Sequence, residues 1–163
     1  MKHISLSIGI VTFFAASLTA SDVPHCVIQE AGKAEYSRRT VPTEEIGIQE
    51  WLADLLGWEE VEFVGQNRVK GKDPSDGRLK LTPAWVFDLE SSFRLEQALA
   101  SAGLWDKYIS ALRHVVAPDG GPEQKMGPKI MHATPKQRAT AALTVLRTVC
   151  EERQRKREEA PRQ

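Results

Sequence analysis

The chain has 163 residues, of which 41% are hydrophobic and 27% are charged. This length and composition suit one packed domain with tails, and they exclude a chain that is disordered throughout. The 22 basic and 22 acidic residues give a formal net charge of zero. A dedicated nucleic-acid-binding protein usually carries a basic excess that neutralises phosphates, so the charge balance argues against that class and leaves only a local basic patch.

The amino terminus, residues 1–20, has the layout of a secretory signal peptide. Lys2 supplies a short basic region, an apolar run extends from Ile4 to Phe14, and small residues follow as far as Ala20. The apolar run is shorter than the roughly 20 residues of a membrane span. One interpretation is export of the protein. The alternatives are an uncleaved amino-terminal anchor or an extension that is not part of the working protein.

The rest of the chain divides by composition into three segments. Residues 21–42 are polar and irregular, which is typical of a linker or disordered arm. A single α+β domain is expected over 43–150, followed by a charged helical tail over 151–163. The two cysteines, Cys26 and Cys150, form no CxxC motif and no zinc pattern. They could pair in an exported protein, whereas the cytosol would keep them reduced.

The domain is expected to open with a helix and a β-hairpin. The helix begins at Thr43, a residue type suited to capping, and ends at Gly57. Strands over 61–64 and 68–72 form the hairpin, with a turn over 65–67 between them.

A central helix is expected from Pro83 to Ala102. Its apolar residues predict the buried side, namely Trp85, Leu89, Phe93, Leu95, Ala98, Leu99 and Ala102. Its polar residues predict the solvent side, namely Asp88, Glu90, Arg94, Glu96 and Gln97. The segment 104–116 is ambiguous, because its apolar residues fit a helical stripe and its composition also suits a strand. Periodicity alone favours the helix.

A long helix is expected from Thr134 to about Glu159, after a brief extended piece at 130–132. Thr134 is the cap and Gln137 is the third helical residue, which together form a capping box, and Pro135 takes the first helical position. The buried stripe is expected to contain Ala139, Ala142, Leu143, Leu146, Val149 and Cys150. Outside the stripe or at its edge we expect Lys136, Arg138 and Thr140.

The order of these motifs resembles that of small proteins encoded by bacteriophages and prophages, similar to the phage ABA sandwich domain group. A helix ending in LLGW and a hairpin precede the phrases LTPAWVFDLESSFRLEQAL, LWDKYISAL and HATPKQRATAAL. The resemblance covers Glu45 to Thr148, near two thirds of the chain. The positions that carry it are Leu56, Gly57, Trp58, Asp88, Leu89, Glu96, His132, Ala133, Thr134, Gln137, Arg138, Ala139 and Leu143.

The resemblance implies an α-β-α sandwich with a small antiparallel sheet, about three helices and three to four strands. It favours a strand over 107–116, against the periodicity. It implies no chemistry. Such phage proteins usually start close to their first helix, so the signal-like residues 1–20 depart from the pattern.

Two histidines, His114 and His132, are open candidates for a site. They would lie close together if their segments paired in one sheet, and a metal site would then need a third ligand such as Asp88 or Glu90. The alternative is that both are partly buried, hydrogen-bonded histidines at sheet ends. The sequence contains no HExxH metal motif, no GxSxG nucleophile elbow and no glycine-rich phosphate loop. We therefore expect no enzymatic activity and no cofactor.

A basic row on the second strand is the best candidate binding patch. Arg68, Lys70 and Lys72 share one face of that strand because side chains alternate, and Trp58 could add base stacking. The alternative is the solvent face of an edge strand, where lysine discourages aggregation.

The resemblance, together with the absence of a catalytic motif, implies a non-enzymatic phage- or prophage-derived protein of undefined role that acts by contact with an unknown protein partner. One alternative is a secreted or periplasmic interaction domain, which residues 1–20 motivate. Another is a weak nucleic-acid-binding module that uses Arg68, Lys70 and Lys72. The protein is exported or periplasmic if residues 1–20 are a signal peptide, and otherwise lies in the cytoplasm of a phage-bearing bacterium. We expect no membrane span beyond that segment, and the oligomeric state stays open.

Overall fold

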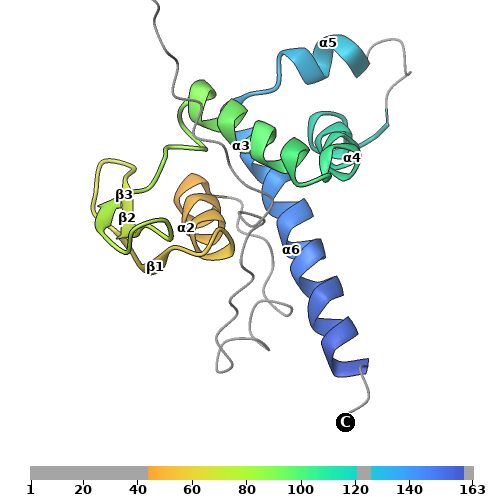
Figure 1. Ribbon diagram of the computed structural model, residues 1–163. Helices are drawn as coiled ribbons and strands as arrows, with labels where there is room; N and C mark the ends of the chain where they lie inside the picture. Colours follow the sequence, from red (N-terminus) through yellow and green to blue (C-terminus); the bar gives the residue numbers. More distant parts are fainter. Residues whose placement is uncertain (1–43, 121–125, 160–163) are drawn as a thin grey trace, which may run out of the picture.

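The computed structural model describes residues 44–120 and 126–159, which form an α+β fold (Figure 1). This part of the chain contains five helices and one three-stranded antiparallel sheet. The helices are α2 (Glu45–Leu55), α3 (Leu89–Ser101), α4 (Trp105–Val116), α5 (Met126–Met131) and α6 (Pro135–Glu159). The strands are β1 (Glu59–Phe63), β2 (Val69–Lys72) and β3 (Leu79–Leu81). The predicted α+β class is confirmed.

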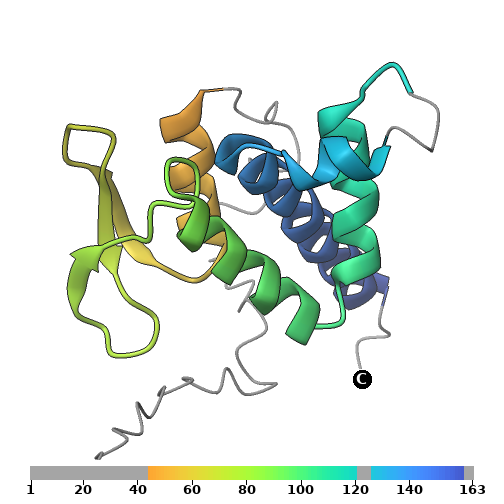
Figure 2. The ribbon, with the colours of Figure 1, turned by 90° about the horizontal axis from the view of Figure 1, so that it is seen from above.

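The long helix α6 lies at the centre of the helical part and packs against α2, α3 and α4. The sheet lies at one side of the molecule, next to α2 and away from α4 (Figure 2). The core forms where the inner faces of these helices meet. Its fully buried members include Ile48, Leu52, Tyr108, Leu112, Ala139, Leu143 and Leu146.

The start of α6 agrees with the predicted capping box. The hydroxyl of Thr134 accepts a hydrogen bond from the backbone N–H of Gln137 at 3.2 Å, and the Gln137 side-chain oxygen accepts one from the N–H of Thr134 at 2.9 Å. These two bonds satisfy donors that the first turn of a helix leaves without partners. All six residues of the predicted buried stripe are buried.

Two glycines end helices as the sequence suggests. Gly57 after α2 and Gly103 after α3 have φ angles of +85° and +71°, a region that residues with a Cβ atom avoid. After α2, the N–H of Trp58 reaches back to the carbonyl of Ala53 at 3.0 Å, as in a Schellman motif. This bond turns the chain from α2 into β1. Thr43, the predicted cap of α2, lies outside the described residues, and the N-cap position is Glu44.

The predicted start of the central helix at Pro83 is wrong, because α3 begins at Leu89. The carboxylate of Asp88 accepts a hydrogen bond from the N–H of Ser91 at 2.6 Å and so caps the helix at this point. The preceding residues form turns, which bury the side chains of Trp85 and Val86 in the core.

Two segments expected to be extended are helical. Residues 107–116, for which the resemblance favours a strand, belong to α4, as the periodicity indicated. Tyr108 and Leu112 stand four residues apart and are both fully buried, which is the spacing of one helix face. Residues 130–132, expected to be extended, include the end of α5.

The predicted hairpin is confirmed as the antiparallel pair of β1 and β2. Its turn has Gln66 and Asn67 at φ angles of +50° and +57°, and the N–H of Arg68 bonds the carbonyl of Gly65 at 3.0 Å. Two central residues with positive φ are the requirement of a type I′ turn, which matches the twist of a hairpin. The third strand, β3, pairs antiparallel with β2 and was not predicted from the sequence.

Candidate protein-contact site

The basic row predicted on β2 already has acidic partners. The ammonium groups of Lys70 and Lys72 form ion pairs with Glu62 and Glu60 on β1. The hydrogen bond from Lys72 to Glu60 raises the pKa of that lysine. The guanidinium of Arg68 donates to the side chain of Gln66 at 3.1 Å. A phosphate group would therefore have to displace carboxylates from the two lysines.

The other predicted member of the patch, Trp58, is half-buried and packs against the edge of the core. Lys80, on the neighbouring strand β3, lies 2.9 Å from carboxylate oxygens of both Asp73 and Asp76. The hairpin is thus a surface of matched charges.

The two candidate histidines lie on helical segments, so the sheet that was expected to bring them together is absent there. His114 is exposed on α4, and His132 is exposed in the junction between α5 and α6. In the described part of the chain, no group of three or more His, Cys, Asp or Glu residues is arranged to hold a metal ion.

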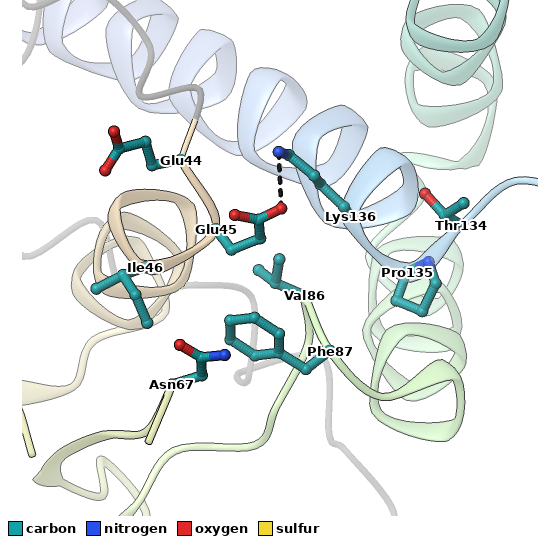
Figure 3. Close-up of a pocket in the computed structure, with 9 residues that line it drawn as sticks. All are labelled: Glu44, Glu45, Ile46, Asn67, Val86, Phe87, Thr134, Pro135 and Lys136. Carbon is teal, nitrogen blue, oxygen red and sulfur yellow. Dashed lines mark hydrogen bonds and ion pairs between the residues drawn. The ribbon is translucent and has the colours of Figure 1, made fainter. Parts of the chain in front are cut away.

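A cleft of about 690 Å³ opens where the amino-terminal ends of α2 and α6 approach the hairpin turn. Its lining residues are Glu44, Glu45, Ile46, Asn67, Val86, Phe87, Thr134, Pro135 and Lys136. Figure 3 shows Val86 and Phe87 between the two helix ends, with the amide of Asn67 beside the Phe87 ring. The cleft thus combines an apolar centre with a polar rim.

One ion pair crosses this cleft between α6 and α2. The ammonium of Lys136 lies 2.8 Å from the carboxylate of Glu45, as the dashed line in Figure 3 marks. The hydrogen bond from Lys136 lowers the pKa of Glu45, which favours the ionised carboxylate. This pair ties the start of α2 to the start of α6.

Four large apolar side chains are exposed at the cleft, on α3 and at the end of α5. Leu89, Phe93 and Met131 are 44%, 41% and 76% exposed, and Phe87, which lines the cleft, is 38% exposed. Leu89 and Phe93 stand four residues apart and so share a face of α3. We call these four residues the α3–α5 surface.

A buried arginine links two members of the α3–α5 surface, Phe93 and Met131. The guanidinium of Arg138 on α6 lies 4.6 Å from the centre of the Phe93 ring, a cation–π contact. The same guanidinium donates hydrogen bonds to the carbonyls of Ile130, Met131 and Ala133 at 3.0–3.3 Å. Phe93 and the backbone at the end of α5 therefore contact one group, the guanidinium of Arg138.

Arg138 is charge-balanced in the interior by Glu96 of α3, since both residues are less than 10% exposed and their side chains form an ion pair. The hydroxyl of Tyr108 on α4 also donates to Glu96. Burial, and then the hydrogen bond to Glu96, raise the pKa of Tyr108 well above its usual range. In the described residues, every buried side-chain nitrogen and oxygen has a hydrogen-bond partner.

Sequence reasoning misplaced the residues of this site. Leu89 and Phe93 were expected to be buried, but both are exposed. Glu96 and Arg138 were expected on or near the solvent side, but both are buried. The sequence does contain a signal for the first error. Phe93 precedes the buried Leu95 by two residues, which is about 200° around a helix, so the two cannot share one face.

No family model matches the chain, and no curated protein or solved structure is significantly similar to it. Within residues 44–120 and 126–159, no helix has both the length and the apolar composition that crossing a membrane requires.

Proposed function

We propose that this protein is a non-enzymatic, phage- or prophage-derived domain that acts by binding another protein through the α3–α5 surface. The observation that carries the proposal is the exposure of Phe87, Leu89, Phe93 and Met131, of which Phe87 lines an open cleft and Phe93 and the backbone of Met131 contact the same arginine. Several large apolar side chains left exposed on one part of a domain are typical of a protein-binding surface.

The magnitude of the apolar contribution fits a binding surface. The exposed parts of the four side chains amount to about two whole side chains, whose burial would contribute ~3–6 kcal/mol. Association itself costs several kcal/mol, so polar contacts around the patch must supply the remainder. The rim of the cleft offers such groups, namely Glu44, Asn67 and Thr134. The expected partner is therefore a segment with apolar side chains for the α3–α5 surface and polar groups for the cleft.

Part of the surface is also held in place before a partner arrives. Arg138 fixes both Phe93 and the carbonyls at the end of α5, so binding would not have to order these groups. A preorganised surface loses less entropy on association.

The phage or prophage origin, and the sandwich arrangement of the fold, rest on the resemblance to the phage ABA sandwich domain group. Capsid, tail or replication genes beside the gene of this protein would support the origin. A neighbourhood of ordinary metabolic genes would count against it.

Photo-crosslinking in the native host tests the contact. A benzophenone amino acid replaces the most exposed member of the surface, Met131, and a control protein carries it at Arg157, near the end of α6. We expect a distinct crosslinked protein at position 131 that is missing at position 157. The same crosslinked species at both positions would refute the proposal.

One observation favours the secreted or periplasmic alternative. Cys150 takes part in a disulfide, a bond that persists in oxidising compartments. Cys26 lies outside the described residues. The intact mass of the protein from its native host decides between the compartments. Loss of about the first 20 residues, with both cysteine thiols unreactive, supports export. An unprocessed chain that begins at Met1 and has free thiols excludes it.

A further inference from the structure

Strand β3 has a free backbone edge. It is the last strand in the order β1-β2-β3, and the N–H of Thr82 and the carbonyl of Arg78 are bonded towards β2. Backbone groups of alternate residues point to the same side of an antiparallel strand, so those of Leu79 and Leu81 point away from β2. Within the described residues, no hydrogen bond engages the outward groups of these two leucines.

The side chains of the same two leucines are also exposed, by 56% for Leu79 and 50% for Leu81. The register pairs Leu79 with Lys72 and Leu81 with Lys70, so the leucines share the outer face of the sheet with these lysines. Both lysines are neutralised by glutamates of β1. The outer face thus has an apolar strip at its free edge and ion pairs behind it.

A lysine at an edge strand usually discourages pairing with another chain. Lys80 of β3 is already held between Asp73 and Asp76, each 2.9 Å from its ammonium group. Its charge is therefore balanced within its own chain, and two copies of Lys80 would not meet as bare cations.

From these observations we propose that β3 is a dimerisation edge, at which two copies of the chain pair antiparallel around a twofold axis at Lys80. In this register Leu79 faces Leu81 of the second copy, and the outward backbone groups of each such pair exchange two hydrogen bonds. The two sheets join into one continuous sheet of six strands. The proposal is independent of the α3–α5 surface.

A second copy fits this edge because the edge is self-complementary. Each row across the joined sheet has two leucines at its centre and an ion-paired lysine on either flank, so an apolar centre lies within a neutral polar rim. An unrelated extended peptide could use the same backbone groups. To match a second copy, it would need apolar side chains opposite both leucines and no net charge beside them.

Sedimentation velocity and residue-resolved hydrogen exchange of the full chain test the pairing together. A three-residue strand supplies only four intermolecular hydrogen bonds, so we expect dimers to form between about 10 µM and about 1 mM. The amides of Leu79 and Leu81 should become protected over the same concentration range, whereas the amide of Lys80, bonded to β2, should be protected throughout. A chain that stays monomeric at 1 mM would overturn the proposal, and so would a dimer in which the amides of Leu79 and Leu81 exchange freely.

Charge substitutions test the register. Leu79→Glu together with Leu81→Glu places like charges opposite each other and should reduce dimer affinity by at least tenfold. Leu79→Lys together with Leu81→Glu places opposite charges in contact and should restore it. Met131→Asp, on the α3–α5 surface, should leave the dimer unchanged.

Each variant should keep the wild-type circular dichroism spectrum, because both leucines are at least half exposed. Equal dimerisation by the repulsive and the attractive variants would refute this register. Dimerisation that is lost with Met131→Asp would assign the contact to the other surface.

Discussion

The buried ion pair between Arg138 and Glu96 gives the sharpest prediction about stability. Replacing Arg138 by methionine keeps the flexible apolar stem of the side chain but removes its ion pair, three backbone hydrogen bonds and the contact with Phe93. Glu96 would remain in the interior with only the hydroxyl of Tyr108 as a partner. Breaking a buried pair in this way costs about 3–5 kcal/mol, because the remaining charge is uncompensated.

A matched control is available on the surface. Arg94 forms an ion pair with Glu90 one turn earlier on α3, and both side chains are more than 70% exposed. Arg94→Met makes the same chemical change without burial, and it should reduce stability by no more than about 0.5 kcal/mol. The difference between the two variants therefore measures what the interior ion pair, the three backbone hydrogen bonds and the contact with Phe93 add together.

Urea unfolding followed by far-ultraviolet circular dichroism measures both free energies. The double variant Arg138→Met, Glu96→Gln removes both charges, and a glutamine oxygen can still accept the Tyr108 hydroxyl. It should recover about 1–2 kcal/mol relative to Arg138→Met alone. If Arg138→Met and Arg94→Met differ by less than about 1 kcal/mol, the role assigned to Arg138 is wrong.

Three further predictions follow from local features. Thr134→Ala should lower the free energy of unfolding by about 1 kcal/mol through loss of the cap, and a change near zero in urea unfolding would contradict the capping box. Gly57→Ala should cost about 1–2 kcal/mol because φ is +85°, whereas Gly127→Ala, at an open position within α5, should be neutral or slightly stabilising; equal melting temperatures would refute this. The raised pKa of Tyr108 means that the unfolded chain loses this proton first, so stability should fall above about pH 10. Tyr108→Phe should flatten that alkaline slope, and an unchanged slope would show that another group is responsible.

The features that the sequence predicts well are those set by neighbouring residues. The capping box of α6, the glycine stop after α2 and the first hairpin each need only a few adjacent residues, and all three are confirmed. The helical periodicity of 104–116 was also correct. The strand that the resemblance favoured there was wrong, because Tyr108 and Leu112 bury one face of a helix.

The features that it predicts badly depend on contacts between distant segments. Pro83 and Asp88 are both suited to the start of a helix. The helix begins after Asp88, because the residues between them form turns that pack Trp85 and Val86 in the core. Strand β3 has three residues, which are too few to show an alternation of apolar and polar side chains. It is recognised only by its hydrogen-bonded pairing with β2.

The candidate site shows the same limit. Glu96 and Arg138 are 42 positions apart, and each looks like an ordinary surface charge until the other lies beside it. With both charges paired in the interior, α3 turns Leu89 and Phe93 outwards. The ion pair between Glu96 and Arg138 thus accounts for both errors on α3. It explains why Glu96 is buried and why Leu89 and Phe93 are exposed.

The central claim is that the protein binds a partner through the α3–α5 surface. The most direct test is the crosslinking yield from position 131 in the native host, measured in three backgrounds: wild type, Leu89→Asp on the same surface, and Leu79→Asp on the sheet edge. Both substitutions place a charge at an exposed leucine, and they differ only in the surface they alter. We predict at least a tenfold loss of yield with Leu89→Asp and an unchanged yield with Leu79→Asp. Equal yields in all three backgrounds would contradict the claim.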